Sequence, residues 1–190
     1  MEALLTSTAL VALAEIGDKT QLLAILLATR FRRPLPIIFG ILVATLANHF
    51  LAALLGQSAA SWLDGSLFRI AVALSFLAMA AWTLVPDTMD DDGPSPARFG
   101  AFLTTCIAFF LVEMGDKTQI ATIALGARFA DVLPVTAGTT LGMMIANVPA
   151  VLLGHQLVER IPLVLVRRIA AALFAGLGLW ILIEVLRGGA

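Results

Sequence analysis

The chain has 190 residues, of which 60% are hydrophobic and 13% are charged, and its mean hydropathy is +0.99. Soluble domains have an apolar fraction of roughly 45–50%, so this composition indicates an integral membrane protein whose main surroundings are the lipid bilayer. The net charge of −1 and the lack of any long run of Lys or Arg give no sign of a nucleic-acid partner. The single cysteine, Cys106, excludes an intrachain disulfide.

Proline, glycine and charged residues divide the chain into six apolar units, each near the ~20 residues that a helix needs to cross the hydrocarbon core. We expect transmembrane helices at residues 3–28, 35–56, 67–85, 99–125, 133–154 and 163–186. Long apolar runs favour helices over the alternating pattern of barrel strands. The first unit lacks a basic region, so it is interpreted as a retained helix rather than a removed signal peptide. The predicted fold is all-α, a polytopic membrane protein with six transmembrane helices.

The second half of the chain repeats the first at an offset of 98 residues, which places Glu15 on Glu113 and Arg30 on Arg128. Each half holds three spans, and an odd number makes the second half enter the membrane from the opposite side. This inverted repeat is typical of secondary transporters, whose sites lie near the midplane between the repeats. We therefore divide the chain into a first three-helix repeat at 1–85, an acidic Pro/Asp linker at 86–98 and a second, inverted three-helix repeat at 99–190.

Basic residues in short loops predict the orientation, because Lys and Arg favour the cytoplasmic side. The loops after spans one, three and five carry seven arginines, and those on the other side carry three. The seven are Arg30, Arg32, Arg33, Arg98, Arg160, Arg167 and Arg168, and the three are Arg69, Arg128 and Arg187. Both termini are therefore expected outside the cytoplasm, and the acidic linker inside it.

Two polar motifs interrupt the apolar spans: EIGDKTQ from Glu15 to Gln21, and EMGDKTQ from Glu113 to Gln119. Each is near the middle of its span, where an ionised residue costs ~2.5–3.5 kcal/mol and is a functional site by default. On a continuous helix, each glutamate would share a face with the lysine four residues later and pair with it.

Facing repeats would bring four carboxylates and two ammonium groups together, leaving a charge of −2 that one divalent cation or two protons would balance. The predicted metal ligands are Glu15, Asp18, Glu113 and Asp116, with Lys19 and Lys117 for charge balance. The amides of Gln21, Gln119, Asn48 and Asn147 are candidate helper ligands, and Gly17 and Gly115 are expected to allow close helix packing or local unwinding. An all-oxygen ligand set suits Ca²⁺, Mg²⁺ and Mn²⁺.

Alternatives to this interpretation remain open at the level of sequence. Two Glu–Lys pairs could form a structural clasp that never meets an ion, and the same carboxylates could line a passive cation channel. The histidines, His49 and His155, lie outside the motifs and do not repeat, so packing or a pore-lining role is favoured for them. An enzyme is disfavoured, because the chain has no HExxH or GxSxG motif.

The duplicated Glu-x-Gly-Asp-Lys-Thr, one copy in each half of a short chain, closely resembles the Gdt-type cation transporters. The resemblance covers essentially the whole chain, with Ile16 and Met114 at the variable position. It implies a cation/proton antiporter that moves Mn²⁺ or Ca²⁺ out of the cytoplasm, with the motif acids as the ion site and no resident cofactor. The compact length resembles the bacterial members, which implies manganese export across the inner membrane and favours Mn²⁺ over Ca²⁺ as the substrate.

Overall fold

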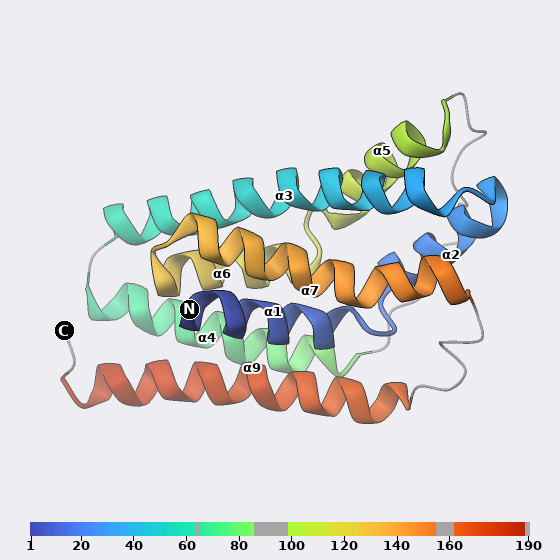
Figure 1. The fold of residues 1–190 in the computed structure, drawn as a ribbon. Coiled ribbons are helices and arrows are strands. Elements are labelled where there is room, and N and C mark those ends of the chain that lie inside the picture. Colours follow the sequence, from blue (N-terminus) through green and yellow to red (C-terminus); the bar gives the residue numbers. More distant parts are fainter. Residues whose placement is uncertain (64, 86–98, 155–161, 189–190) are drawn as a thin grey trace.

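The computed structural model describes residues 1–63, 65–85, 99–154 and 162–188, and within these residues the regular structure is entirely helical (Figure 1). The acidic linker at 86–98 lies outside the described residues, as do Arg98, His155 and Arg160. The described helices are α1 (Glu2–Glu15), α2 (Lys19–Phe31), α3 (Pro34–Trp62), α4 (Ser66–Thr83), α5 (Ala101–Glu113), α6 (Lys117–Phe129), α7 (Val132–Leu153) and α9 (Leu163–Leu186).

Four of these helices, α3, α4, α7 and α9, are long and apolar enough to cross a membrane. Their bounds agree closely with the predicted spans at 67–85, 133–154 and 163–186. The span predicted at 35–56 continues to Trp62, because Gly56 does not end the helix. A Cβ atom at Gly56 would collide with the backbone of Ile123, so this glycine allows α3 and α6 to approach each other closely.

The predicted continuous helices at 3–28 and 99–125 are wrong, because each is broken in the middle of its motif. The first becomes α1 and α2, and the second becomes α5 and α6. Each piece has 13 or 14 residues and is about 20 Å long at 1.5 Å per residue, too short to cross the bilayer alone. The breaks lie beside the glycines for which local unwinding was one of the two expected roles.

The distribution of polar residues is the reverse of that in a soluble protein. Large apolar side chains such as Leu55, Leu165 and Trp180 are exposed on the outside of the bundle. Glu15 and Glu113, by contrast, have no exposed surface. Because lipid rather than water solvates the apolar outer face, this arrangement is that of a multi-pass membrane protein.

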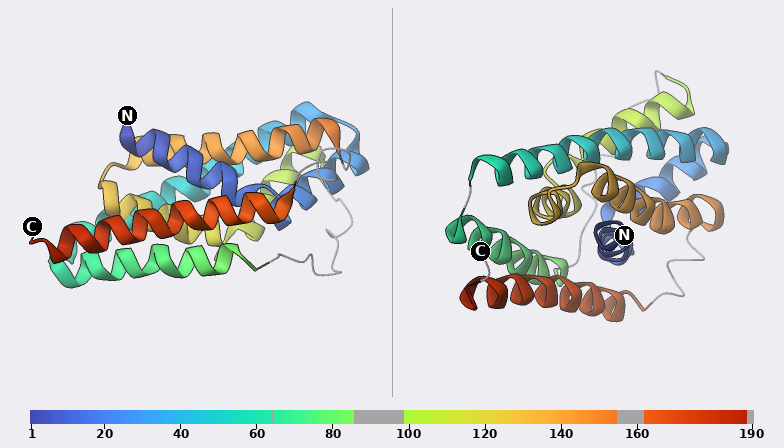
Figure 2. Two further views of the ribbon diagram at one scale, coloured as in Figure 1. Left: turned by 90° about the horizontal axis from the view of Figure 1, so that it is seen from below. Right: turned by 60° about the vertical axis from the view of Figure 1, so that its left-hand side comes forward.

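Helices that correspond in the two halves make reciprocal contacts. α1 packs against α7 and α5 packs against α3, while α4 and α9 form a pair of their own. Figures 1 and 2 show α4 and α9 side by side along one face of the bundle, and α1 beginning at the end where α9 finishes. Gly138 faces Leu4 of α1, and its counterpart Gly40 faces Phe102 of α5, so small residues mark both crossings.

Candidate cation site

Each motif forms a tight turn between two half-helices. Ile16 has φ −65° and ψ 115°, Gly17 has φ +81°, and the Asp18 N–H donates to the Glu15 carbonyl at 3.0 Å. These values define a type II β-turn, whose third residue needs a positive φ and therefore glycine. The second motif repeats this turn, with Gly115 at φ +79° and a 3.1 Å bond from the Asp116 N–H to the Glu113 carbonyl.

The turns place the four acidic residues of the motifs at the ends of the half-helices. Asp18 is the N-cap of α2 and Asp116 is the N-cap of α6, while Glu15 and Glu113 are the last residues of α1 and α5. A helix N-terminus favours negative charge and a C-terminus favours positive charge. The aspartates therefore lie where the peptide dipoles stabilise them, and the two C-terminal ends add negative potential that attracts a cation.

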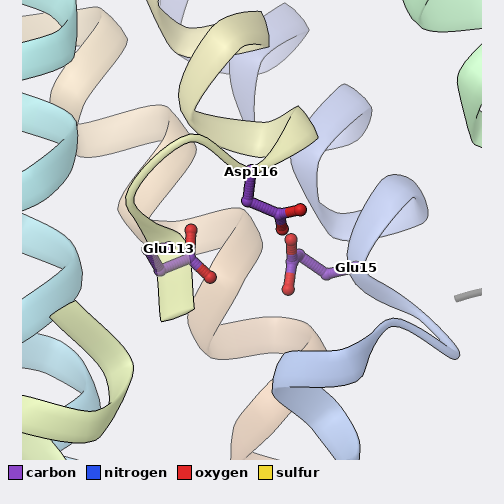
Figure 3. Close-up of side chains that lie close together, drawn as sticks. All are labelled: Glu15, Glu113 and Asp116. Atoms are coloured by element: carbon purple, nitrogen blue, oxygen red, sulfur yellow. The ribbon is translucent and has the colours of Figure 1, made fainter. Parts of the chain in front are cut away.

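Three of the four predicted acidic ligands form one group. Ligand oxygens of Glu15, Glu113 and Asp116 all lie within 4.8 Å of one another, and all three side chains are buried. Figure 3 shows the three carboxylates pointing toward a common centre, one from the end of α1 and two from the second motif. The fourth acid, Asp18, is also buried and is connected to the second motif through an ion pair with Lys117.

Each carboxylate of this group has an oxygen that makes no hydrogen bond to any described residue. These oxygens are Glu15 Oε1, Glu113 Oε1 and Asp116 Oδ2. A buried acceptor without a partner costs about 1–3 kcal/mol, and more when it is charged. Three carboxylates this close together, each with such an oxygen, are suited to share a proton or a hard cation.

The lysines connect the motifs rather than following the expected pairing along one helix. Lys19 Nζ is 3.0 Å from Asp116 Oδ1, and Lys117 Nζ is 2.6 Å from Asp18 Oδ1. The expectation of a shared helical face for each Glu and the Lys four residues later was wrong, because the helix ends at the glutamate and a new one begins at the lysine. Each lysine therefore balances an aspartate of the other half.

Two threonines that were not among the predicted site residues hold the glutamates in place. The Thr20 hydroxyl donates to Glu15 Oε2, and the Thr118 hydroxyl donates to Glu113 Oε2 at 3.0 Å. Both threonines are completely buried. The signal was present in the motif, since Thr follows Glu by five residues in both copies.

The candidate helper amides differ in their hydrogen bonding. Gln21 Oε1 accepts the Gly17 N–H at 2.9 Å, and Gln119 Oε1 accepts the Gly115 N–H at 2.6 Å, so both glutamines support the turns. The Gln119 amide also donates to Asn48 Oδ1. Asn147 Oδ1 is buried and makes no hydrogen bond to the described residues, which makes it the helper oxygen most available to a ligand.

His49 also reaches the site, although its position outside the motifs favoured packing or a pore-lining role. It is completely buried in α3, and its Nε2 is 3.7 Å from Glu113 Oε2. The available signal was its place directly after Asn48, a candidate helper that does repeat. The other histidine, His155, lies outside the described residues.

Buried carboxylates at paired helix breaks within a polytopic helical protein are typical of membrane transporters for ions. Comparison with known families agrees with this class. The model of the divalent cation/proton antiporter GDT1 family matches residues 3–91 and 101–188, so the chain belongs to this family. The family consists of transporters rather than enzymes.

Individual relatives extend over most of the chain. A protein of Vibrio cholerae named "Putative manganese exporter" is 53% identical over 175 residues, which cover 92% of this chain and 87% of the relative. A GDT1-like protein of Synechocystis is 30% identical over 87% of this chain and 89% of its own length. GDT1-like protein 3 of Oryza sativa subsp. indica is 29% identical over 92% of this chain and 71% of its own length. No solved structure has a significant match to the chain.

Proposed function

We propose that this protein exports a divalent cation from the cytoplasm in exchange for protons, with Mn²⁺ favoured over Ca²⁺ as the substrate. The observation that carries the proposal is the buried convergence of Glu15, Glu113 and Asp116, each with an oxygen unpartnered among the described residues. Asp18 completes the acidic set, and Lys19 and Lys117 balance part of its charge. The preference for Mn²⁺ is supported by the name of the Vibrio cholerae relative.

The site is proposed to lie between two inverted three-helix repeats, 1–85 and 99–190, which together form six membrane crossings. Reciprocal contacts support this architecture: exchanging each residue for its counterpart converts the Lys19–Asp116 pair into the Lys117–Asp18 pair. Phe76 and its counterpart Phe174 stack on each other with ring centroids 6.4 Å apart, as expected for residues beside a pseudo-two-fold axis. The α1–α2 and α5–α6 pairs would be the two discontinuous spans.

The charge of the site explains why binding of the cation would be coupled to release of protons. Four carboxylates and two ammonium groups carry a net −2, so one divalent cation or two protons would neutralise the site. A low-dielectric environment penalises any uncompensated charge. The two occupants therefore replace each other, and alternating exposure of the site to the two sides would convert a proton gradient into cation export.

The proposed location is the inner membrane, with both termini outside the cytoplasm. The start of α1 and the end of α9 lie at the same end of the bundle, which supports an even number of crossings (Figure 2). The excess of arginines at the opposite ends of the predicted spans supports the direction. Accessibility of a tag at each terminus in intact cells tests it, and a cytoplasmic C-terminus would overturn the assignment.

The structure also bears on the clasp alternative. A clasp would need only the Lys–Asp pairs, and these leave Glu15 and Glu113 with oxygens that accept no hydrogen bond from the described residues. Burying a carboxylate oxygen without a hydrogen-bond donor destabilises the fold, and a clasp would gain nothing from it. Their presence therefore favours a site that exchanges ligands over a permanent lock.

The test is cation uptake into proteoliposomes that contain the purified protein, with and without an imposed pH gradient. We expect uptake of Mn²⁺ that depends on the gradient and that is abolished in Asp18→Asn and Asp116→Asn. Glu184→Gln is the matched control, because it removes a carboxylate that pairs with Arg69 and Arg128 away from the site. Uptake unaffected by the gradient would indicate a channel, and unchanged uptake in both Asp variants would refute the site.

A further inference from the structure

His49 is a polar group whose burial the carboxylate site alone does not explain. Its side chain has no exposed surface, and neither Nδ1 nor Nε2 makes a hydrogen bond within the described part of the chain. A buried polar group without a partner costs about 1–3 kcal/mol. The corresponding position of the second half is Val148, once the one-residue shift between Asn48 and Asn147 is included, so the repeated architecture accepts an apolar residue there.

The distance between His49 and Glu113 is unsuited to a direct bond. Nε2 is 3.7 Å from Glu113 Oε2, whereas N–H···O hydrogen bonds measure about 2.7–3.2 Å. Two ligands at about 2.1 Å from one ion are separated by about 3.0 Å when adjacent and about 4.2 Å when opposite. The observed separation falls between these limits, so one ion can contact both atoms.

We propose that His49 is a nitrogen ligand of the transported ion, beside Glu113, and that it gives the site its preference for Mn²⁺ over Ca²⁺. This inference rests on the proposed function and adds to it the source of selectivity. Ligand oxygens of Glu15 and Asp116 lie within 4.8 Å of an oxygen of Glu113, so the ion would be held by carboxylate oxygens and one imidazole nitrogen.

The chemistry of the ligands supports selectivity of this kind. Ca²⁺ and Mg²⁺ are hard cations that take oxygen ligands almost exclusively. First-row transition metals accept imidazole nitrogen, with affinities that rise from Mn²⁺ along the series. Carboxylates alone discriminate poorly between Mn²⁺ and Ca²⁺. Replacing one oxygen by a nitrogen therefore penalises Ca²⁺ more than Mn²⁺.

The first test measures the ratio of Mn²⁺ to Ca²⁺ uptake in proteoliposomes with a pH gradient, for the unmodified protein, His49→Gln and His49→Ala. Loss of a group that supports metal binding typically costs 10–100-fold in affinity, so we expect the ratio to fall by about tenfold or more. His155→Gln removes the other histidine and should leave the ratio unchanged. A ratio that stays the same in both His49 variants would overturn the inference, while absence of any cation uptake by the unmodified protein would instead overturn the proposed function.

The second test needs no transport, and its decisive outcome is measured on the unmodified protein. Electron spin-echo modulation of Mn²⁺ bound to the purified protein detects ¹⁴N nuclei that are directly bonded to the ion. We expect a ¹⁴N signal from one imidazole in the unmodified protein and in His155→Gln, and its loss in His49→Gln. Mn²⁺ bound without any ¹⁴N signal would show that His49 is not a ligand and would overturn the inference.

Discussion

Lys117 of the second motif lies 2.6 Å from Asp18 of the first, so a charge in one half of the chain is neutralised by the other half. In the reciprocal pair, Lys19 Nζ lies 3.0 Å from Asp116 Oδ1. The two pairs differ in environment, since the Lys117 side chain is 4% exposed and the Lys19 side chain is 31% exposed. The two ion pairs thus have similar distances, but solvent reaches Lys19 more easily than Lys117.

The first prediction concerns this inequality. Lys117→Met removes a buried cation from beside Asp18 and is expected to destabilise the protein by about 3–5 kcal/mol, the range for breaking a buried pair. Lys19→Met is expected to cost less, because solvent that reaches the partly exposed Lys19 ammonium screens its ion pair with Asp116. The measurement is the thermal unfolding midpoint of each variant in detergent.

A double variant supplies the control for this prediction. Adding Asp18→Asn to Lys117→Met removes the carboxylate that lost its lysine partner and is expected to restore most of the lost stability, without restoring transport. Equal midpoints for Lys117→Met and Lys19→Met would contradict the proposed difference between the pairs.

The second prediction concerns the two turn glycines. An L-residue at φ near +80° is strained by about 1–3 kcal/mol, so Gly115→Ala and Gly17→Ala should both lower stability and transport. A Cβ at Gly115 would meet no atom within 4 Å, whereas one at Gly17 would lie 2.7 Å from a methyl carbon of Leu163. The difference between their unfolding midpoints therefore measures the contact with Leu163. Leu163→Ala combined with Gly17→Ala should remove that difference; if it persists, backbone strain differs between the turns.

Much of this fold could be predicted from the sequence, and the exceptions have a common cause. The apolar runs that became α4, α7 and α9 were located within a few residues, because hydropathy alone determines which segments enter the membrane. The apolar residues around each motif predict continuous helices, although Gly at the third turn position and Asp at the N-cap are both readable as signals of a break. Pairing across the halves depends on how the two turns meet, and no spacing within one motif contains that information.

Some residues of the site can be identified from the sequence and others cannot. The acids could be identified because ionisable groups in a span are costly and need a reason. Thr20 and Thr118 carry no such cost, and their role depends on the turn that brings each hydroxyl back to its glutamate. His49 comes from a third helix and has no repeated partner, so the internal symmetry that revealed the acids could not reveal it.

The third prediction tests these threonines. Thr20→Val and Thr118→Val keep the shape of the side chain and remove the donor to a glutamate oxygen. Hydrogen bonds to charged groups contribute about 1.5–3 kcal/mol, so the Mn²⁺ concentration for half-maximal uptake should rise by about tenfold or more. Thr20→Ser and Thr118→Ser retain the hydroxyl and should transport normally. Valine variants that transport as well as the unmodified protein would contradict the role of the hydroxyls.

The last prediction separates the two asparagines, which correspond in the repeat but differ in their bonding. Asn48 Oδ1 accepts from the Gln119 amide, whose own oxygen supports the second turn. Asn147 donates to the Met143 carbonyl at 3.1 Å, while its Oδ1 accepts no hydrogen bond from the described residues. Asn48→Ala is therefore expected to lower the unfolding midpoint, because it leaves the half-buried amide donor of Gln119 without its acceptor.

Asn147→Ala is expected to act on the cation instead. Its free amide oxygen is of the type that hard cations accept, so its loss should weaken Mn²⁺ binding while the unfolding midpoint without metal changes little. The measurements are the unfolding midpoint with and without Mn²⁺, because a ligand that binds only the folded state raises stability in proportion to the logarithm of its concentration over its Kd. A smaller Mn²⁺-induced shift in Asn147→Ala than in Asn48→Ala would identify Asn147 as the helper ligand. The opposite order would assign that role to Asn48 and would mean that the Asn48–Gln119 bond opens when the ion binds.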